Sequence, residues 1–358
     1  MKVFFDHQMF SHQKIGGVSK YFAKLLSNLP PDSWTTSTVF SENQYVKDLN
    51  LFPVVKIPGS EFKGKGRLRL ELGIPFTLWH LARKKYDVYH QTHYERFSLW
   101  GIGNKPMVTT VHDMNFFTSN INKRLQQDMI KSCERADRII AISESTKNEL
   151  IDLLGIDENK VTVIYHGIDH LDLRAIPQNK IYDFPYILYV GNRRNRFKNF
   201  DSFIKSFSIL AEKNKEIKLI CTGVPFNEQE LKLFESLKIS NKCYSIFASE
   251  MQMNQLYRDA LFFAYPSLSE GFGMPILEAM QCGCPNVLAK ASCFPEIAKN
   301  AAEYFDPQSV DDMYEVMNRV CQNETIRKRL VQDGFQRVQD FSWKKTAAEH
   351  YSLYQSLA

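Results

Sequence analysis

The residues best suited to chemistry are two glutamates, Glu270 and Glu278, on either side of a glycine-rich turn. The stretch 267–285 reads S-L-S-E-G-F-G-M-P-I-L-E-A-M-Q-C-G-C-P. A carboxylate can accept hydrogen bonds from two neighbouring hydroxyl groups at once, so this pair suits a ligand that carries many hydroxyls. One glutamate could hold a ribose and the other a second sugar. The alternative is that both are surface glutamates at the start of a helix.

The elements around this pair are predicted to be a strand, a loop and a helix. Residues 260–266 form a short apolar run closed by Pro266, which is typical of a buried parallel strand. Pro275 suits the first turn of the helix that follows. Gly271 and Gly273 would let backbone N–H groups approach an anion, and the helix N-terminus adds partial positive charge. A nucleotide diphosphate would fit at this place.

The sequence E-G-F-G-M-P-I-L-E at 270–278 resembles the two-glutamate signature of family 4 glycosyltransferases, and E-A-M-x-C-G at 278–283 extends the resemblance. Members of that family are retaining enzymes of the GT-B fold. The resemblance implies an α/β protein with two Rossmann-like domains that face each other across a cleft. We expect residues 1–176 to form the acceptor-binding domain and residues 177–340 the nucleotide-sugar-binding domain. Residues 341–358 are expected to form a helix that crosses back to the first domain.

A cationic loop follows the predicted strand 185–190, with the sequence G-N-R-R-N-R-F-K-N. Four cations in one loop are costly unless water or an anion surrounds them, and a diphosphate would supply that anion. The loop resembles the family's G-x-R…K-N motif, which implies that Lys198 and then Arg193 contact the phosphates. Arg194 and Arg196 crowd the motif, so the choice of arginine stays open. A merely solvated loop is the alternative.

The strand predicted over residues 106–111 ends at His112 and Asp113. In the family a histidine at this place contacts the donor sugar or the reaction centre, and the resemblance implies that role for His112. Asp113 could fix the tautomer of the imidazole or cap the next helix. The resemblance thus implies four catalytic residues, which are His112, Arg193, Lys198 and Glu270.

The resemblance also implies which residues bind the two substrates. Glu270 would bind hydroxyls of the transferred sugar, Glu278 the ribose, and the loop at Ser249 the nucleobase. The expected donor-binding residues are Gly16, Gly17, Arg193, Lys198, Ser249, Gly271, Phe272, Gly273, Met274 and Glu278. The expected acceptor-binding residues are His90, His93, Tyr94 and Asp113. The histidines could instead simply pack, and a zinc site would need further ligands that do not stand nearby, so we expect no metal.

Composition describes an ordinary soluble globular chain of 358 residues, 44% hydrophobic and 24% charged, which is long enough for two domains. Strand and helix signals alternate along the first half, for example a strand at 54–57 and a helix at 74–85. No apolar run reaches membrane-spanning length, and the N-terminus does not resemble a signal peptide, so we expect a cytoplasmic protein. The seven cysteines are odd in number and scattered, which favours packed thiols over disulfides or a metal clip.

The formal net charge is +5, and much of the excess lies in residues 62–85. The cations there are Lys63, Lys65, Arg67, Arg69, Arg83, Lys84 and Lys85, set among apolar residues and opposed only by Glu71. This basic 62–85 region could rest on anionic lipid headgroups at the cytoplasmic face of the inner membrane, bind an anionic acceptor, or be a solvated face. Nucleic acid is not expected, because no recognition motif accompanies the charge.

Taken with these features, the resemblance implies a metal-independent, cofactor-free retaining hexosyltransferase. It would move a hexose from a nucleotide-sugar donor (GDP-mannose-like, or a UDP- or dTDP-sugar) to a glycan or lipid-linked acceptor in bacterial surface polysaccharide synthesis, such as O-antigen, capsule or lipopolysaccharide. A GT-B sugar-nucleotide epimerase and a non-catalytic sugar-nucleotide-binding subunit are the alternatives. A phosphorylase would normally need a lysine for a covalent cofactor and a longer chain, which argues against this class of enzyme.

Overall fold

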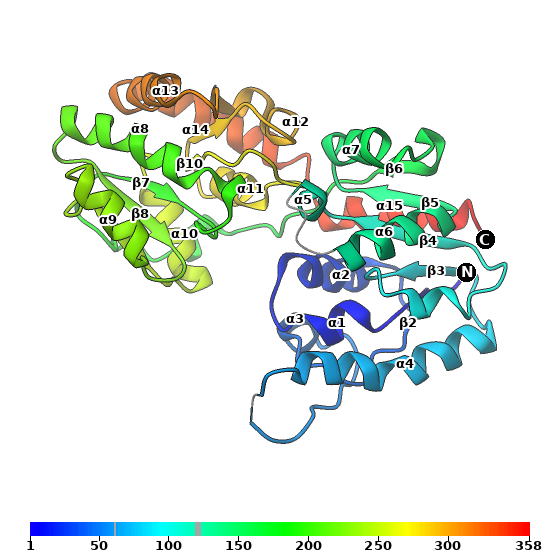
Figure 1. Cartoon of the computed structure of the whole chain (residues 1–358). Helices are drawn as coiled ribbons and strands as arrows, with labels where there is room; N and C mark the ends of the chain where they lie inside the picture. The colour runs from blue at the N-terminus through cyan, green and yellow to red at the C-terminus, as the bar shows by residue number, and fades with distance from the viewer. Residues whose placement is uncertain (61, 119–122) are drawn as a thin grey trace. The chain divides into compact units, whose positions relative to one another are not determined.

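The computed structural model describes residues 1–60, 62–118 and 123–358 (Figure 1). The chain divides into two compact units. The first unit comprises Met1–Gly167 together with Ser342–Ala358, and the second unit comprises Ile168–Phe341. The sequence predicted the first boundary after residue 176, whereas in the structure it falls after Gly167.

The described part of the first unit holds a six-stranded parallel sheet in the order β2-β1-β3-β4-β5-β6. Its strands are β1 (Val3–Phe5), β2 (Trp34–Thr36), β3 (Val88–Gln91), β4 (Met107–Val111), β5 (Arg138–Ala141) and β6 (Val161–Val163). Its α-helices are α1 (Gln8–His12), α2 (Gly17–Asn28), α3 (Gln44–Asp48), α4 (Lys65–Arg83), α5 (Asn115–Thr118), α6 (Lys123–Arg135), α7 (Glu144–Leu154) and α15 (Trp343–Gln355).

The described part of the second unit holds another six-stranded parallel sheet, in the order β12-β11-β10-β7-β8-β9. Its strands are β7 (Tyr186–Tyr189), β8 (Lys218–Thr222), β9 (Cys243–Ile246), β10 (Phe262–Tyr265), β11 (Asn286–Ala289) and β12 (Ala302–Phe305). Its α-helices are α8 (Phe200–Lys213), α9 (Glu228–Ser236), α10 (Glu250–Asp259), α11 (Met274–Gln281), α12 (Phe294–Ala298), α13 (Val310–Gln322) and α14 (Glu324–Val338). The predicted α/β fold class is confirmed.

Apolar runs form the strands because helices cover both faces of a parallel sheet. Every residue of β4, with the sequence M-V-T-T-V, is buried, as is every residue of β10, with the sequence F-F-A-Y. In the second unit, α8 and α13 lie side by side on the sheet, and α11 packs against α14 (Figure 1). The strand predicted at 54–57 is wrong, because Val55 makes only an isolated bridge with Phe40. Prolines on both sides of that segment favour an irregular edge over a regular strand.

Helix α4 begins at Lys65 rather than at Ile74, so Pro75 lies inside it. A proline within a helix disrupts the hydrogen bonds of the preceding turn. Here the carbonyl of Leu70 accepts a hydrogen bond from His7 Nε2 at 2.8 Å, and His7 Nδ1 accepts one from the Thr77 hydroxyl at 2.6 Å. The ring reaches the helix because Gly73 has no side chain in its way.

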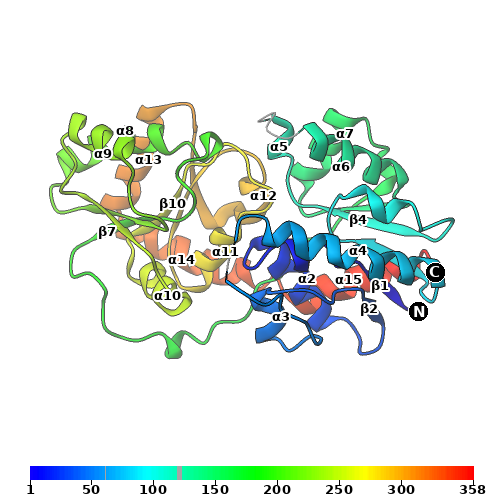
Figure 2. The same cartoon turned by 60° about the horizontal axis from the view of Figure 1, so that its bottom comes forward.

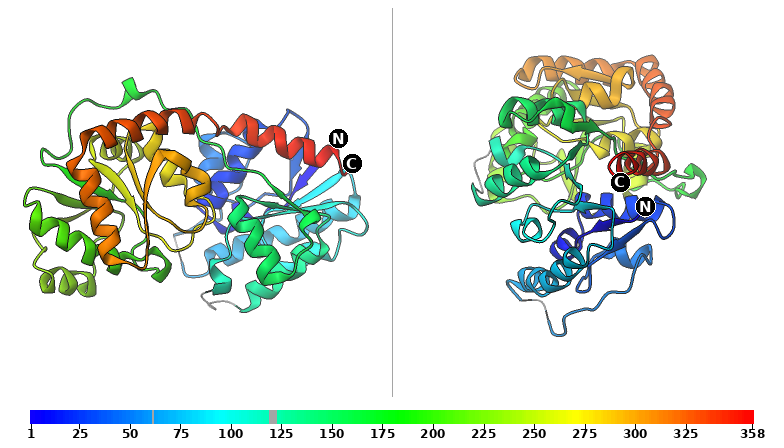
Figure 3. Two further views of the ribbon diagram at one scale, coloured as in Figure 1. Left: turned by 90° about the horizontal axis from the view of Figure 1, so that it is seen from above. Right: turned by 90° about the vertical axis from the view of Figure 1, so that its right-hand side faces the viewer.

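The C-terminal helix α15 belongs to the first unit and packs against α2 (Figure 2). It begins where the backbone of Gly167 lies against that of Ser342 and Trp343, too close for any β-carbon at position 167. Tyr354 on α15 packs edge-on against Phe5 of β1 with the ring centroids 6.3 Å apart. The two ends of the chain consequently lie side by side (Figure 3).

Buried histidines and tyrosines join α15 to the sheet. His350 Nδ1 donates to the Thr346 carbonyl at 2.7 Å, so its Nε2 accepts the hydrogen bond from the Tyr21 hydroxyl at 2.6 Å. His90 lies beside this pair and bonds the Tyr354 hydroxyl at 2.6 Å. Burial lowers the pKa of His350 to about 4 and holds that of His90 well below its usual range. These histidines are therefore neutral in the folded protein.

The first prediction concerns the approach of His7 to α4. Gly73→Ala would place a β-carbon in the His7 ring, so we expect the free energy of unfolding to fall by about 1–3 kcal/mol, the usual cost of overpacking. Gly66→Ala is the matched control on the same helix, because its β-carbon would lie 3.6 Å from the nearest atom. Urea unfolding measures both; equal midpoints for the two variants would contradict this account of α4.

The second prediction concerns pH. Burial lowers the pKa of a set of histidines in the first unit, namely His7, His90, His93, His112, His166 and His350. The unfolded chain binds protons near pH 6.5 and the folded protein does not, so the stability is complete above pH 6.5 and falls as the pH drops towards 4. Each histidine contributes about 2 kcal/mol of this loss at pH 5. Asp6, whose pKa burial raises to about 6, acts in the opposite direction, as do Glu149 and Glu349, whose pKa values burial also raises, but these carboxyls are fewer than the histidines.

The measurement is the melting temperature between pH 8 and pH 4.5 for the native protein, for His350→Gln and for the exposed control His170→Gln. The His350 variant should lose less stability on acidification than the native protein, since glutamine can still accept from Tyr21 but does not titrate. The His170 variant should follow the native curve. Parallel curves for all three proteins would show that His350 is not held neutral.

Candidate functional site

An ion pair between Lys198 and Glu270 joins two loops of the second unit. Lys198 precedes α8, and Glu270 lies in the glycine-rich loop between β10 and α11. The Tyr265 hydroxyl, at the end of β10, lies 3.4 Å from Lys198 Nζ. The structure therefore brings together two residues that were predicted to be catalytic, although the two are far apart in the sequence.

The loop that carries Lys198 is fixed beside the glycine-rich loop. Leu268 donates a backbone hydrogen bond to the Phe197 carbonyl at 2.7 Å, and the Asn199 side chain donates to the Pro307 carbonyl at 2.7 Å. Gly191, at the start of the loop, has φ of +134°, a value that favours glycine. The ammonium group of Lys198 is thus held at the carboxyl edge of the sheet, where α/β proteins bind ligands.

The glycine-rich loop leads directly into the N-terminus of α11. Gly273 has φ of +83° and caps α11, with Pro275 in its first turn. The carbonyl of Glu270 accepts a hydrogen bond from the Ser292 hydroxyl at 2.7 Å and lies 3.2 Å from Cys293 Sγ. These bonds fix the main chain of Glu270 while its side chain reaches Lys198.

The other predicted donor-binding residues of this unit lie on neighbouring helices. Glu278 is on α11, where its carboxylate accepts from the Tyr257 hydroxyl at 3.3 Å. Ser249 caps α10, and its hydroxyl and backbone N–H both bond Gln252. Burial, and then the charge of Glu278, hold the pKa of Tyr257 well above its usual range, so Tyr257 stays a hydrogen-bond donor.

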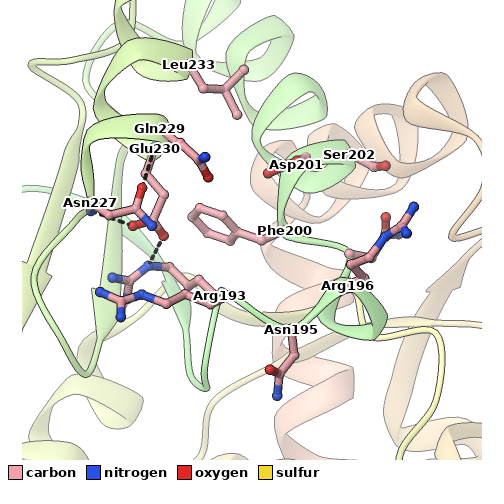
Figure 4. Close-up of a pocket in the computed structure, with 12 residues that line it drawn as sticks. Arg193, Asn195, Arg196, Phe200, Asp201, Ser202, Asn227, Gln229, Glu230 and Leu233 are labelled. Atoms are coloured by element: carbon pink, nitrogen blue, oxygen red, sulfur yellow. Dashed lines mark hydrogen bonds and ion pairs between the residues drawn. The ribbon is translucent and has the colours of Figure 1, made fainter. Parts of the chain in front are cut away.

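Arg193 pairs with a different carboxylate from Lys198. Its side chain is 2% exposed, and its Nε donates to Glu230 Oε1 at 2.7 Å. The expected phosphate contact for Arg193 stays a prediction, and the guanidinium is already bound within the unit. Arg193 also lines a cavity of about 580 Å³, together with Arg194, Arg196 and the first turns of α8 and α9 (Figure 4).

In the first unit, His112 follows β4 and is half-buried. Its Nε2 is shielded from solvent and has no hydrogen-bond partner among the described residues. Tyr21 packs edge-on against it with the ring centroids 4.8 Å apart. Burial, and then the neighbours His93 and His350, lower the pKa of His112 to about 3. At neutral pH this imidazole carries no charge, and it can donate or accept a hydrogen bond with a ligand.

Of the four residues expected to bind the acceptor, the structure buries two and leaves two partly exposed. His90 is fully buried, and its nitrogens bond the hydroxyls of Tyr354 and Thr110, so it lies in the core instead of facing an acceptor. Tyr94 is buried and donates to the Thr110 carbonyl at 3.1 Å. The physical reason for the burial of His90 is that it lies within β3, where Tyr354 of α15 covers its side chain.

His93 and Asp113 lie nearer to solvent, and both are half-buried. His93 stacks on the exposed His12 with the ring centroids 5.4 Å apart. Asp113 Oδ1 accepts from the backbone N–H of Asn115 at 3.0 Å, as a cap does. Gly16 and Gly17 stand at the N-terminus of α2, where a β-carbon at position 16 would overlap the Gln13 side chain but one at position 17 would meet nothing.

Sequence reasoning missed three aromatic residues that position this chemistry. Tyr265 lies beside Lys198, Tyr257 bonds Glu278, and Tyr21 packs on His112. Each lies in a buried strand or helix where an aromatic residue usually only packs. The available signal for Tyr265 was its place at the last position of a strand, directly before the loop that carries Glu270.

Two family models match adjacent parts of the chain. The model described as Glycosyltransferase Family 4 matches residues 15–170, and the model described as Glycosyl transferases group 1 matches residues 174–337. The matches include both the unit with His112 and the unit with Lys198 and Glu270.

Individual proteins show the same relationship. The chain is 26% identical over 269 residues to O-antigen chain mannosyltransferase B of Escherichia coli, covering 70% of each chain. It is 30% identical over 250 residues to the serotype-specific mannosyltransferase WbdA of Escherichia coli, covering 66% of this chain but only 30% of WbdA. The crystal structure of Anabaena Alr3699/HepE in complex with UDP and glucose matches the whole of both chains with a TM-score of 0.72 at 19% identity. With both units matched by its models and the fold shared over the full length, this chain belongs to the family 4 (group 1) glycosyltransferases.

Proposed function

We propose that this protein is a retaining hexosyltransferase that moves a hexose from a nucleotide-sugar donor to a glycan or lipid-linked acceptor. The observation that carries the proposal is the Lys198–Glu270 pair beside the N-terminus of α11. A diphosphate needs cations and backbone N–H groups, and a sugar needs a carboxylate. All three groups lie on adjoining loops of one sheet edge.

Binding of the donor would change the partner of Lys198. A diphosphate carries more negative charge than a carboxylate and would attract the ammonium group away from Glu270. Glu270 would then be free to accept hydrogen bonds from hydroxyls of the transferred sugar. The N–H groups of residues 271–274 would face the phosphates and the sugar, and Glu278 would bind the ribose.

Transfer would use the charges that the donor meets on binding. Lys198 and the N-terminus of α11 would stabilise the leaving diphosphate, so the proposal needs no metal. The leaving diphosphate would help to deprotonate the acceptor hydroxyl on the same face of the sugar, which retains the configuration. His112 would contact the transferred sugar as a neutral imidazole.

The relatives' names support the choice of sugar and pathway. They are called mannosyltransferases, and one is called an O-antigen chain enzyme, so we propose GDP-mannose as the first donor to test and a surface polysaccharide as the product. A thermal-shift and hydrolysis screen of GDP-, UDP-, dTDP- and ADP-sugars, with and without metal, tests this. Failure of all four to stabilise the protein would overturn the assigned donor contacts.

The third prediction separates the roles of the ion pair. Glu270→Ala should lower kcat/KM by about 10²- to 10³-fold, because it removes a contact to the reacting sugar. It should leave the affinity for the nucleoside diphosphate unchanged or higher, since Lys198 no longer has to leave a carboxylate. Lys198→Met should weaken diphosphate binding about 10- to 100-fold, the worth of a hydrogen bond to a charged group.

Lys205→Met is the matched control, because Lys205 is exposed on α8 a few residues beyond Lys198. It should change neither binding nor turnover. Calorimetry and a donor-consumption assay give the two readouts. A non-catalytic binding subunit would show diphosphate binding with no turnover in the native protein, and equal loss of affinity in the Glu270 and Lys198 variants would contradict the separate roles.

We also propose a contact between the basic 62–85 region and an anionic membrane. The structure changes the set of residues available for it, because Lys65 and Arg69 are buried and both bond Glu42. The cations and large apolar residues that remain exposed are Phe62, Lys63, Arg67, Leu72, Phe76, Trp79, Arg83, Lys84 and Lys85, and of these Arg67 already pairs with Glu71 and Glu95. Leu72, Phe76 and Trp79 are spaced to share one face of α4. No helix in the described ranges is long and apolar enough to span a bilayer.

The fourth prediction tests this contact with vesicles. The native protein should bind vesicles that contain anionic lipid and bind neutral vesicles much more weakly. Phe76→Ala with Trp79→Ser should abolish binding, and Lys84→Ser with Lys85→Ser should weaken it about tenfold or more, because each cation near the surface contributes about 1 kcal/mol. Trp100→Ser is the control, since Trp100 is 80% exposed but lies outside the region. Equal sedimentation of all variants would exclude this face as the contact.

A further inference from the structure

Arg193 lines the cavity of about 580 Å³, but its guanidinium is bonded within the second unit like an internal strut. Its guanidinium is buried and makes three hydrogen bonds: Nε donates to Glu230 at 2.7 Å, Nη1 to the Thr222 carbonyl at 3.4 Å and Nη2 to the Val224 carbonyl at 2.5 Å. Its Cζ also lies 4.8 Å from the ring centroid of Phe226. In Figure 4 the side chain points towards Asn227 and Glu230, while Arg196 points away on the other side of Phe200.

The partner Glu230 is also buried and fully hydrogen-bonded through both carboxylate oxygens. Its side chain is 9% exposed, and its second carboxylate oxygen accepts a hydrogen bond from the backbone N–H of Asn227 at 2.8 Å. The Asn227 side chain in turn accepts from the backbone of Glu230, so the two residues form a capping box at the start of α9. Moving Arg193 away would leave a buried carboxylate without its cation, which is strongly destabilising.

Three segments therefore meet at one side chain. Arg193 belongs to the loop 191–199, its carbonyl partners belong to the end of β8 and the loop after it, and Glu230 belongs to the first turn of α9. The planar guanidinium can bond several acceptors at once in fixed directions, which a lysine cannot do. The far end of the loop 191–199 is held separately, at Phe197 and Asn199.

We propose that Arg193 is a positioning residue, which sets the place of Lys198 by tying the loop 191–199 to the β8–α9 loop, and that it does not itself bind the donor phosphates. The proposal rests on the proposed role of Lys198 at the diphosphate. Lys198 differs from Arg193 in that its ammonium group is a compact point charge that bonds a carboxylate and a tyrosine hydroxyl. Lys198 can change partners when a ligand binds. To contact a ligand, Arg193 would have to break its hydrogen bonds to the Thr222 and Val224 carbonyls and to Glu230, which belongs to the capping box of α9.

The experiment compares the two ends of the strut. Glu230→Gln keeps the cation of Arg193 but weakens the pair, and Arg193→Lys keeps the charge but loses the bonds to the carbonyls. Affinity is measured by calorimetry for whichever of GDP, UDP, dTDP and ADP binds the native protein. Both variants should bind it about tenfold more weakly, the scale of loss expected from a displaced contact, and the double variant should be no weaker than either single variant.

Glu228→Gln is the matched control, because Glu228 is exposed on the same first turn of α9. It should bind within about twofold of the native protein. A direct phosphate contact predicts a different pattern, in which Arg193→Lys loses affinity and Glu230→Gln does not, and that pattern would overturn the proposal. Thermal unfolding of each variant shows that the comparison is made on folded protein.

Amide hydrogen exchange on ligand-free Arg193→Lys provides a second, independent test. The strut predicts faster exchange in residues 222–227, which are far from position 193 in the sequence, as well as in the loop 191–199. A residue that only binds phosphate would leave exchange in 222–227 unchanged in the ligand-free protein, and this result would also overturn the proposal. If no nucleoside diphosphate binds the native protein, the proposed function fails, but the exchange measurement still decides whether the strut exists.

Discussion

Burial of both sheets on both faces is the constraint on which the rest of the structure depends. Strands such as β7 and β10 are buried along their whole length, so an ionised group within them would have no water and no partner. The ionised side chains Lys198 and Glu270 accordingly lie in loops beyond the carboxyl ends of the strands. In a parallel sheet those loops share one edge, and this geometry places Lys198 next to Glu270 although they are 72 residues apart.

Two ion pairs at that edge of the second unit differ in ways that follow from their chemistry. The ammonium group of Lys198 is compact and sits on a flexible stem, so it can exchange one anion for another. The guanidinium of Arg193 is planar and bonds a carboxylate and two carbonyls at fixed angles. The Lys198–Glu270 pair therefore suits a site where a ligand replaces one partner. The Arg193–Glu230 pair suits a fixed contact between two loops. Counting cations in the loop does not distinguish these two roles.

The first unit places its histidines inside a neutral, aromatic environment. Tyr21 stands at the centre, in contact with His112 on one side and hydrogen-bonded to His350 of α15 on another. Burial keeps these imidazoles uncharged, so they serve as directional hydrogen-bonding groups. The arrangement requires the end of the chain, because Tyr21 and His350 are 329 residues apart.

The sequence by itself determined the parts that local patterns control. Apolar runs placed the strands, glycine and proline positions placed the loop and start of α11, and the spacing of Glu270 and Lys198 within their motifs marked two residues that the structure joins. Tertiary structure decided what depends on distant partners. The helix predicted to begin at Ile74 begins at Lys65 in the structure and runs through Pro75, with His7 bonded to the Leu70 carbonyl. His90 was expected to bind the acceptor or to pack, and in the structure it is buried with both nitrogens bonded to the hydroxyls of Tyr354 and Thr110. Lys65 and Arg69 were included in the predicted basic surface, but in the structure both are buried and paired with Glu42. The physical reason is common to these cases: a side chain's role follows from which groups exclude water from it, and those groups come from elsewhere in the chain.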